Sequence, residues 1–177
     1  MSKGGRRRFE HKYLPEFVYG GIDGNVTTFA VVAGAIGASL QSSIVLILGF
    51  ANLFADGFSM AVSNYLSNKS RNELSTKARG VDPQKTALVT FVSFLVVGLI
   101  PLLSFLFAII FGDGFISKNQ FVLSFILTGV ALFIVGLMKG NVVKKHPVRA
   151  AFETLLIGGI AAGIAFAVGH FVRGIVG

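Results

Sequence analysis

Five stretches of this 177-residue chain are long enough and apolar enough to cross a lipid bilayer. A membrane-spanning helix needs about 20 mostly apolar residues. Only 14% of the residues are charged, whereas a typical soluble domain has about 25%. The sequence therefore predicts an all-α membrane protein, with a basic N-terminal tail (1–16) and one five-helix transmembrane domain (17–177). The expected spans are Phe17–Leu40, Ile44–Ser67, Ala87–Phe111, Phe121–Met138 and Ala150–Phe171.

The basic residues fall on one side of these predicted spans. Of the 16 Lys and Arg residues, all but Lys118 and Arg173 precede the first span or lie in the connections 68–86 and 139–149. Since basic loops stay on the cytoplasmic side, this pattern predicts a cytoplasmic N-terminus and a C-terminus outside or in a lumen. It also accounts for the net charge of +8. Anionic membrane lipids are therefore expected partners, and nucleic acid is not.

Two carboxylic acids, Asp23 and Asp56, interrupt the first two apolar stretches. A charged side chain near the centre of a span costs about 2.5–3.5 kcal/mol on insertion scales, so such residues usually face a pore or a partner. On the second stretch, helical spacing puts Asp56 on one polar face with Asn52, Ser59, Met60, Ser63, Asn64 and Ser67. A polar face of this length cannot face lipid, so it must line water, a partner helix or an ion route.

The depths of these residues favour a metal site. At a rise of about 1.5 Å per residue, Asp23 lies roughly 9 Å and Met60 roughly 10 Å from the cytoplasmic ends of their helices. Asp56 lies about one turn deeper. Carboxylates alone suit hard cations, and a thioether adds a soft ligand, so the mixed set favours Fe²⁺ or Mn²⁺, with Co²⁺, Ni²⁺ or Zn²⁺ also compatible. Without metal the same carboxylates could carry protons, so metal and proton would compete for one site.

Two other interpretations of the buried acids stay open. One is a metal or proton channel without obligatory exchange. The other is a structural membrane module whose acids only hold helices together. An enzyme is not expected, because GxSxG, HExxH and GxxxxGK[ST] motifs are all missing from the sequence. No permanently bound cofactor is expected either.

Proline and glycine predict details of the bundle. Pro101, in the middle of the third span, predicts a kink. Pro83 suits the first turn of the third helix itself or of a short helix that leads into it. Small residues at a spacing of four predict close helix contacts in the first and fifth spans. These pairs are Gly20/Gly24, Gly34/Ala38, Gly159/Gly163 and Ala161/Ala165.

The segments YGGIDGNVTTFAVVAG (19–34) and ADGFSMAVSNYLS (55–67) resemble the vacuolar iron transporter family. The stretches 87–103 and 153–169 extend the resemblance to nearly all five helices in order. The resemblance implies a homodimer that exports Fe²⁺ or Mn²⁺ from the cytosol in exchange for protons. It places the transport pathway at the dimer interface, between the first two helices of each subunit. The membrane would be the plasma membrane in a prokaryote and the vacuolar membrane in a eukaryote.

The resemblance assigns roles to the same residues. Asp23 corresponds to the family's membrane aspartate and Met60 to its pathway methionine. Many members have a glutamate where this chain has Asn52 and another where it has Asn64. Asp56 could replace part of this missing charge, one turn away. We therefore expect transport ligands at Asp23 and Met60, a second carboxylate or proton site at Asp56, and weaker oxygen ligands at the two asparagines.

The chain also differs from the family in the connection 68–86. Well-studied members insert a Glu-rich metal-binding domain at this point. Here the connection offers only Glu73 and Asp82 as acidic ligands. The chain therefore looks like a compact branch of the family that lacks the cytoplasmic domain.

Overall fold

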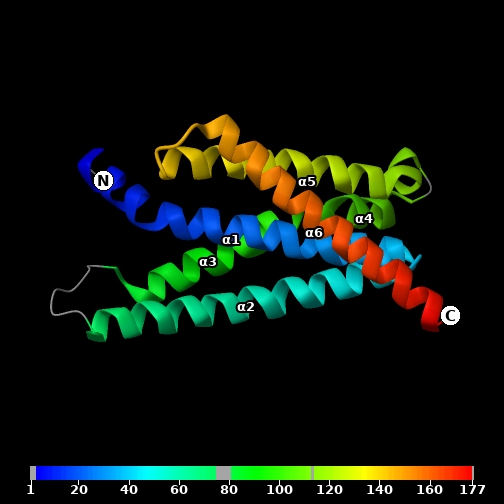
Figure 1. Ribbon diagram of the computed structural model, residues 1–177, viewed down its shortest axis with the longest axis horizontal. Helices are drawn as coiled ribbons and strands as arrows, with labels where there is room; N and C mark the ends of the chain where they lie inside the picture. The colour runs from blue at the N-terminus through cyan, green and yellow to red at the C-terminus, as the bar shows by residue number, and fades with distance from the viewer. Residues whose placement is uncertain (1–2, 75–80, 113, 177) are drawn as a thin grey trace.

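The protein is a bundle of long α-helices in this computed structural model (Figure 1). The structure describes residues 3–74, 81–112 and 114–176, with side chains from residue 13 onward. No strand occurs in these ranges, so the all-α prediction is confirmed. The helices are α1 (Lys3–Gly37), α2 (Ser42–Leu74), α3 (Pro83–Gly98), α4 (Ile100–Phe111), α5 (Phe115–Val142) and α6 (Pro147–Val176).

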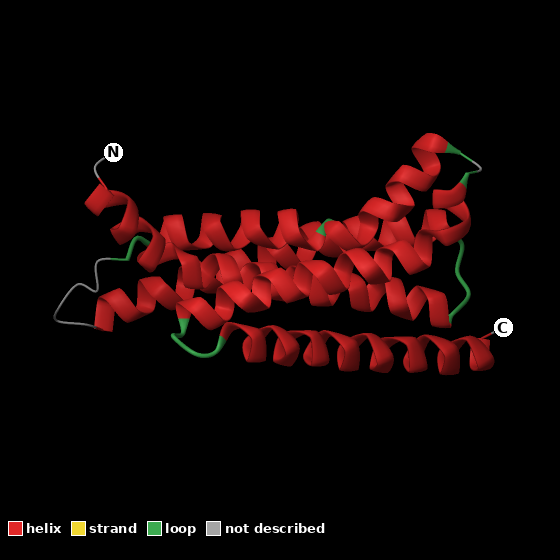
Figure 2. Ribbon diagram, turned by 90° about the horizontal axis from the view of Figure 1, so that it is seen from above, coloured by secondary structure: helices red, strands yellow, loops and turns green. Residues whose placement is uncertain are grey.

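The two ends of the bundle carry different connections (Figure 1). One end holds the start of α1, the end of α2, the start of α3 and the turn from α5 to α6. We call this the basic end, because most of the Lys and Arg residues of the sequence lie in these segments or next to them in the chain. The C-terminus lies at the opposite end, where α6 finishes its course along the edge of the bundle (Figure 2).

Every predicted span lies inside a longer helix or pair of helices, except that α1 ends a little early, at Gly37. At the basic end, α1 already begins at Lys3 and α2 continues to Leu74, so the polar connection 68–86 is shorter than expected. Hydropathy marks only the apolar part of a helix, whereas its hydrogen bonds continue into polar sequence. The prediction for Pro83 is confirmed. It is the first residue of α3, and the N-cap Asp82 accepts a hydrogen bond from the Gln84 N–H at 3.0 Å.

Length and composition support up to four membrane spans in the described residues. The helices α2, α5 and α6 are each long and apolar enough, and the bent pair of α3 and α4 passes as one further span. The first helix, α1, does not pass this test, although the sequence predicted a span there. It contacts all five other helices, so much of its surface faces protein and can carry Gly, Thr and Asn.

Glycines let α1 approach two of its neighbours closely. Gly24 lies directly against the backbone of Phe94 in α3, and a Cβ at Gly98 would come within 2.7 Å of the Gly24 carbonyl oxygen. Near its other end, α1 packs Gly34 against the Ala165 backbone of α6. The predicted close helix contacts are therefore confirmed at Gly24 and Gly34. Gly159 and Gly163 face open space on the outer side of α6 and make no such contact within the described residues of the single chain.

The predicted kink at Pro101 is confirmed as a 49° bend between α3 and α4. Proline has no N–H, so the Val97 carbonyl one turn earlier loses its helical partner. The side chain of Asn25, fully buried on α1, replaces that partner with an Nδ2–H bond of 3.2 Å to the Val97 oxygen. On the α4 side, Ser124 Oγ donates to the Pro101 carbonyl at 2.6 Å. Two neighbouring helices thus satisfy the backbone around the bend.

This arrangement makes Asn25 a stability determinant that depends on Pro101. We expect Asn25→Leu to lower the free energy of unfolding by about 1–3 kcal/mol, because it leaves a buried carbonyl without a donor. In a Pro101→Ala background the alanine N–H can bond to Val97, so the same leucine substitution should cost less. Denaturant titration in detergent measures both costs. Equal costs in the two backgrounds would contradict the proposed role of Asn25.

Candidate metal site between α1 and α2

A polar cavity of about 350 Å³ opens between α1 and α2, towards the basic end of the bundle. Two of the predicted ligands, Met60 and Asn64, line it together. The full lining consists of Glu16, Tyr19, Met60, Ser63, Asn64, Ser67, Asn68 and Arg71. The structure therefore brings a thioether and an amide into one polar space, on the helix face where the sequence predicted them.

The amide of Asn64 is held by its neighbours. Its Oδ1 accepts a hydrogen bond from Asn68 Nδ2 at 2.9 Å, and the same Nδ2 reaches Thr86 Oγ1 on α3 at 3.1 Å. A carbonyl oxygen has two lone pairs, so Asn64 keeps one acceptor position for a cation. This network fixes the amide beside Met60.

The two acids lie beyond this cavity, further from the basic end. Asp56 precedes Met60 by four residues, which is about 6 Å along the helix axis. The carboxylates of Asp56 and Asp23 are close enough to interact electrostatically across the α1–α2 contact, and both side chains are half-buried. Thr27 Oγ1 donates to the Asp23 backbone carbonyl at 2.8 Å. The Thr27 hydroxyl is therefore bonded to the backbone of Asp23 and not to its carboxylate.

Asn52 continues the series one more turn along α2. Its Nδ2 is buried, and no hydrogen-bond partner for it occurs in the described part of the chain. The α2 residues 52, 56, 60 and 64 thus form a row of donor atoms at one-turn spacing, with Asp23 beside it on α1. The structure places four of the predicted ligands in this row and Asp23 near Asp56, but only Met60 and Asn64 share the cavity.

Four further residues that line the cavity were not predicted: Glu16, Tyr19, Asn68 and Arg71. Burial raises the pKa of the Glu16 carboxyl, and the positive charge of Arg71 partly opposes this. One sequence signal could have identified Glu16. It precedes Asp23 by seven residues, and two helical turns return a side chain to nearly the same face.

The other faces of α2 are either packed against α3 or exposed. Leu53 and Gly57 turn inward and pack against α3, whereas Phe54 and Phe58 are 55% and 65% exposed. The polar face predicted from the sequence also stays at the surface of a single chain. Its Ser59, Ser63 and Ser67 are all exposed.

The donor set of this site is mixed. In residues 3–74, 81–112 and 114–176, no three His, Asp or Glu side chains gather around one point. The available donors are two carboxylates, a thioether and amide oxygens. Such a set suits divalent ions between the hard and soft extremes. Together, the apolar helices and the polar row on α2 define a helical membrane protein with a candidate ion site between two of its helices.

Comparison with known proteins gives the family. The model of the VIT family matches residues 14–81 and 71–170, and the chain belongs to this family. It is 29% identical to a vacuolar iron transporter of Toxoplasma gondii, over 93% of this chain and 76% of the relative. It is 27% identical to the vacuolar iron transporter of Centaurea cyanus, over 90% of each protein. It is 26% identical to vacuolar iron transporter 1 of Arabidopsis thaliana, over 89% of this chain and 85% of the relative.

The comparisons also show that a relative is longer than this chain within the matched region. The alignment with the Toxoplasma protein runs over 229 residues, more than the 177 residues of this chain. That relative therefore carries residues inside the matched region that this chain lacks. The two segments matched by the family model overlap at 71–81, a range that begins in the last turn of α2 and ends before α3.

Proposed function

We propose that the protein transports Fe²⁺ or Mn²⁺ out of the cytosol in exchange for protons. The observation that carries this proposal is the row of donors on α2, with Met60 and Asn64 in one polar cavity and the Asp23–Asp56 pair about a turn further along. The relatives named as vacuolar iron transporters support iron as the metal. In this proposal α1 is the first of five spans, and the basic end faces the cytosol.

The mouth of the cavity would receive the ion from the cytosol. Glu16 provides a carboxylate there, just before the predicted first span, and Arg71 faces the same cavity. Met60 and Asn64 come next, followed by Asp56 and Asp23. Because this chain has only a short connection between α2 and α3, it would capture metal directly at this mouth, without a cytoplasmic binding domain.

The charge of the acidic pair is the physical reason for exchange. Two ionised carboxylates carry two negative charges, which one divalent ion or two protons can neutralise. A net charge in a low-dielectric site is costly, so either loaded state is favoured over the empty, doubly charged one. Alternation between metal and protons then keeps the site close to neutral throughout the cycle.

The exposed polar face of α2 supports a homodimer. Ser59, Ser63 and Ser67 cannot face lipid without cost in a single chain. A second copy of the chain that packs against this face would cover it and enclose the row of donors between two subunits. The membrane would be the plasma membrane if the protein is prokaryotic and the vacuolar membrane if it is eukaryotic.

A conservative substitution at Met60 tests the role of the thioether. We expect Met60→Leu to preserve the volume of the side chain and to reduce Fe²⁺ flux into proteoliposomes at least about tenfold, which corresponds to about 1.4 kcal/mol of binding free energy. Met138→Leu is the matched control, because Met138 packs against an apolar cluster of α1, α3 and α5. Equal flux in the two variants would remove Met60 from the set of transport ligands.

The same assay separates the alternative functions. A channel would pass metal without moving protons and without a response to a pH gradient. A structural module would bind no metal in the wild type, and Asp23→Asn would prevent folding. The most informative single experiment is therefore flux of Fe²⁺, Mn²⁺, Co²⁺, Zn²⁺ and Ca²⁺, each with and without a proton gradient.

A further inference from the structure

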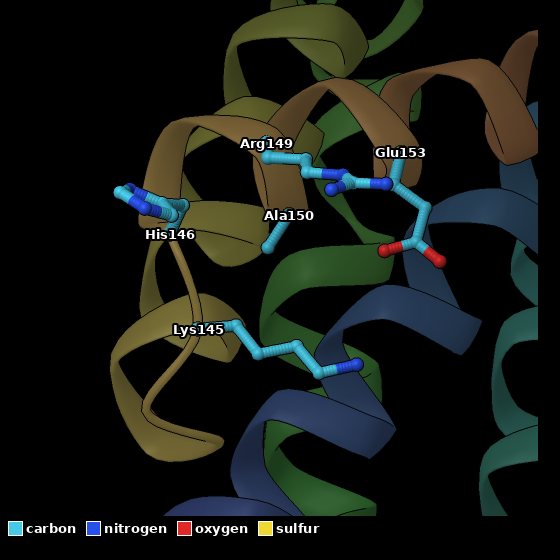
Figure 3. Close-up of a pocket in the computed structure, with 5 residues that line it drawn as sticks. All are labelled: Lys145, His146, Arg149, Ala150 and Glu153. Atoms are coloured by element: carbon cyan, nitrogen blue, oxygen red, sulfur yellow. The ribbon is translucent and has the colours of Figure 1, made fainter.

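A second polar cavity, of about 480 Å³, lies at the turn between α5 and α6, also at the basic end (Figure 3). It is separate from the cavity between α1 and α2 and shares no lining residue with it. Its lining consists of Lys145, His146, Arg149, Ala150 and Glu153. Nothing in the proposed transport cycle uses these residues.

The charges around this cavity leave it positive. Glu153 is paired with Lys139, whose Nζ lies 3.6 Å from the Glu153 carboxylate, so its negative charge is already offset. Lys145 and Arg149 form no ion pair within the part of the chain that the structure describes. Figure 3 shows both side chains extending toward the side of the cavity where Glu153 lies, while the His146 ring turns the other way. Two cationic groups thus flank one space.

The backbone holds these two groups in place. The Lys145 N–H bonds to the Gly140 carbonyl at 3.0 Å, and Lys144 adopts a left-handed conformation with φ +53°, which closes the end of α5. Arg149 follows within the first turn of α6, where the Ala150 N–H bonds to the His146 carbonyl at 3.1 Å. The first N–H groups of a helix have no intrahelical acceptor, and they mark the positive end of its dipole. The cavity therefore offers two side-chain cations on a fixed backbone.

The surroundings of the cavity indicate where its ligand comes from. Val148 and Phe152, on the same turns of α6, are 56% and 61% exposed. In a membrane protein, such side chains face acyl chains. A basic cavity next to them therefore lies at the boundary between lipid tails and water, where phospholipid head groups are found.

We propose that this cavity binds a phosphate group, and that the phosphate belongs to an anionic membrane lipid. Arg149 can bond to two phosphate oxygens at once through its planar guanidinium, and Lys145 adds a mobile point charge. The acyl chains of the lipid would then lie along the apolar surface of α6. The proposal does not depend on metal transport.

The test uses the purified protein in a neutral detergent, titrated with dioctanoyl phosphatidylglycerol, with the unfolding temperature as the readout. We expect the lipid to raise this temperature in the wild type. In the double variant Lys145→Gln/Arg149→Gln, the apparent affinity should fall at least about tenfold, the loss expected for one charge-assisted contact. The single variant Lys145→Gln is compared with the matched control Lys144→Gln, which also removes one charge from the same turn but from a residue that does not line the cavity.

Three outcomes would overturn the proposal. Undiminished lipid binding by the double variant would exclude the cavity as the binding site. A loss of affinity in Lys144→Gln equal to that in the cavity variant would show only general charge attraction. If sodium phosphate gave the same shift as the lipid at equal concentration, the ligand would be a soluble phosphate and not a lipid. Should the double variant fold poorly, Arg149→Lys keeps the charge and removes the paired hydrogen bonds, and weaker lipid binding by it would support the site.

Discussion

Asp23→Asn should reduce Fe²⁺ flux in proteoliposomes at least about 100-fold, which corresponds to about 3 kcal/mol of binding free energy. The amide has nearly the shape of the carboxylate but no charge. One carboxylate, Asp56, would then remain to neutralise a divalent ion, and the loaded site would keep a net positive charge in a low-dielectric region. Flux is measured with a metal-quenched dye inside the vesicles, and proton movement with a pH-sensitive dye.

Two further variants make this result specific. Asp56→Asn should also lower metal flux, and it should lower the number of protons moved per metal ion if Asp56 is a proton site. Asp82→Asn is the control, because Asp82 caps α3 outside the site and asparagine caps helices equally well. Normal flux in Asp23→Asn, in a correctly assembled protein, would refute the proposed role of Asp23.

The second large effect concerns the crossing of α1 and α3. We expect Gly24→Val to destabilise the protein by about 3 kcal/mol or more, at the upper end of the usual cost of overpacking. An added Cβ would lie 2.9 Å from Phe94 Cα and 3.0 Å from its carbonyl carbon. These are backbone atoms, so no rotamer change can relieve the contact, and α1 must move away from α3. Denaturant titration followed by circular dichroism measures the loss.

Gly159→Val is the matched control for this variant. Gly159 lies on α6 with nothing within 4 Å of an added Cβ. The same substitution there should leave the free energy of unfolding nearly unchanged. If both variants lost stability equally, the loss would come from the general change from glycine to valine and not from the α1–α3 contact. Asp23 precedes Gly24 on α1, so displacement of this helix should also move the Asp23 carboxylate. The Gly24→Val variant should therefore show a reduced metal flux.

Much of this architecture is predictable because apolar length and helical spacing are local properties. They predict the helices, the polar face of α2 and the bend at Pro101. They also place Met60 and Asn64 on one face, where the cavity contains both. The predicted span over 17–40 is not apolar enough to pass as a membrane span by composition. The reason is that α1 is packed by protein on many sides and carries small and polar residues there.

The parts that could not be predicted depend on how the helices are rotated against one another. Arg71 lies outside the apolar stretches, and only the packing of α1 on α2 brings it to the cavity that Glu16 also lines. The bond from Asn25 to the Val97 carbonyl likewise joins residues 72 positions apart. Spacing within one helix carries no information on such contacts.

The hydrogen bond from Asn25 to Val97 also has a consequence for biogenesis. At Pro101 the bent segment α3–α4 lacks the helical N–H that would bond to the Val97 carbonyl, and the side-chain donor that replaces it belongs to α1. A carbonyl without a partner is costly in hydrocarbon. Chains are made from the N-terminus, so α1 is already synthesised when α3–α4 reaches the membrane and can supply the donor at once. The order of the helices along the chain is therefore also an order in which they can be assembled without exposing this carbonyl to lipid.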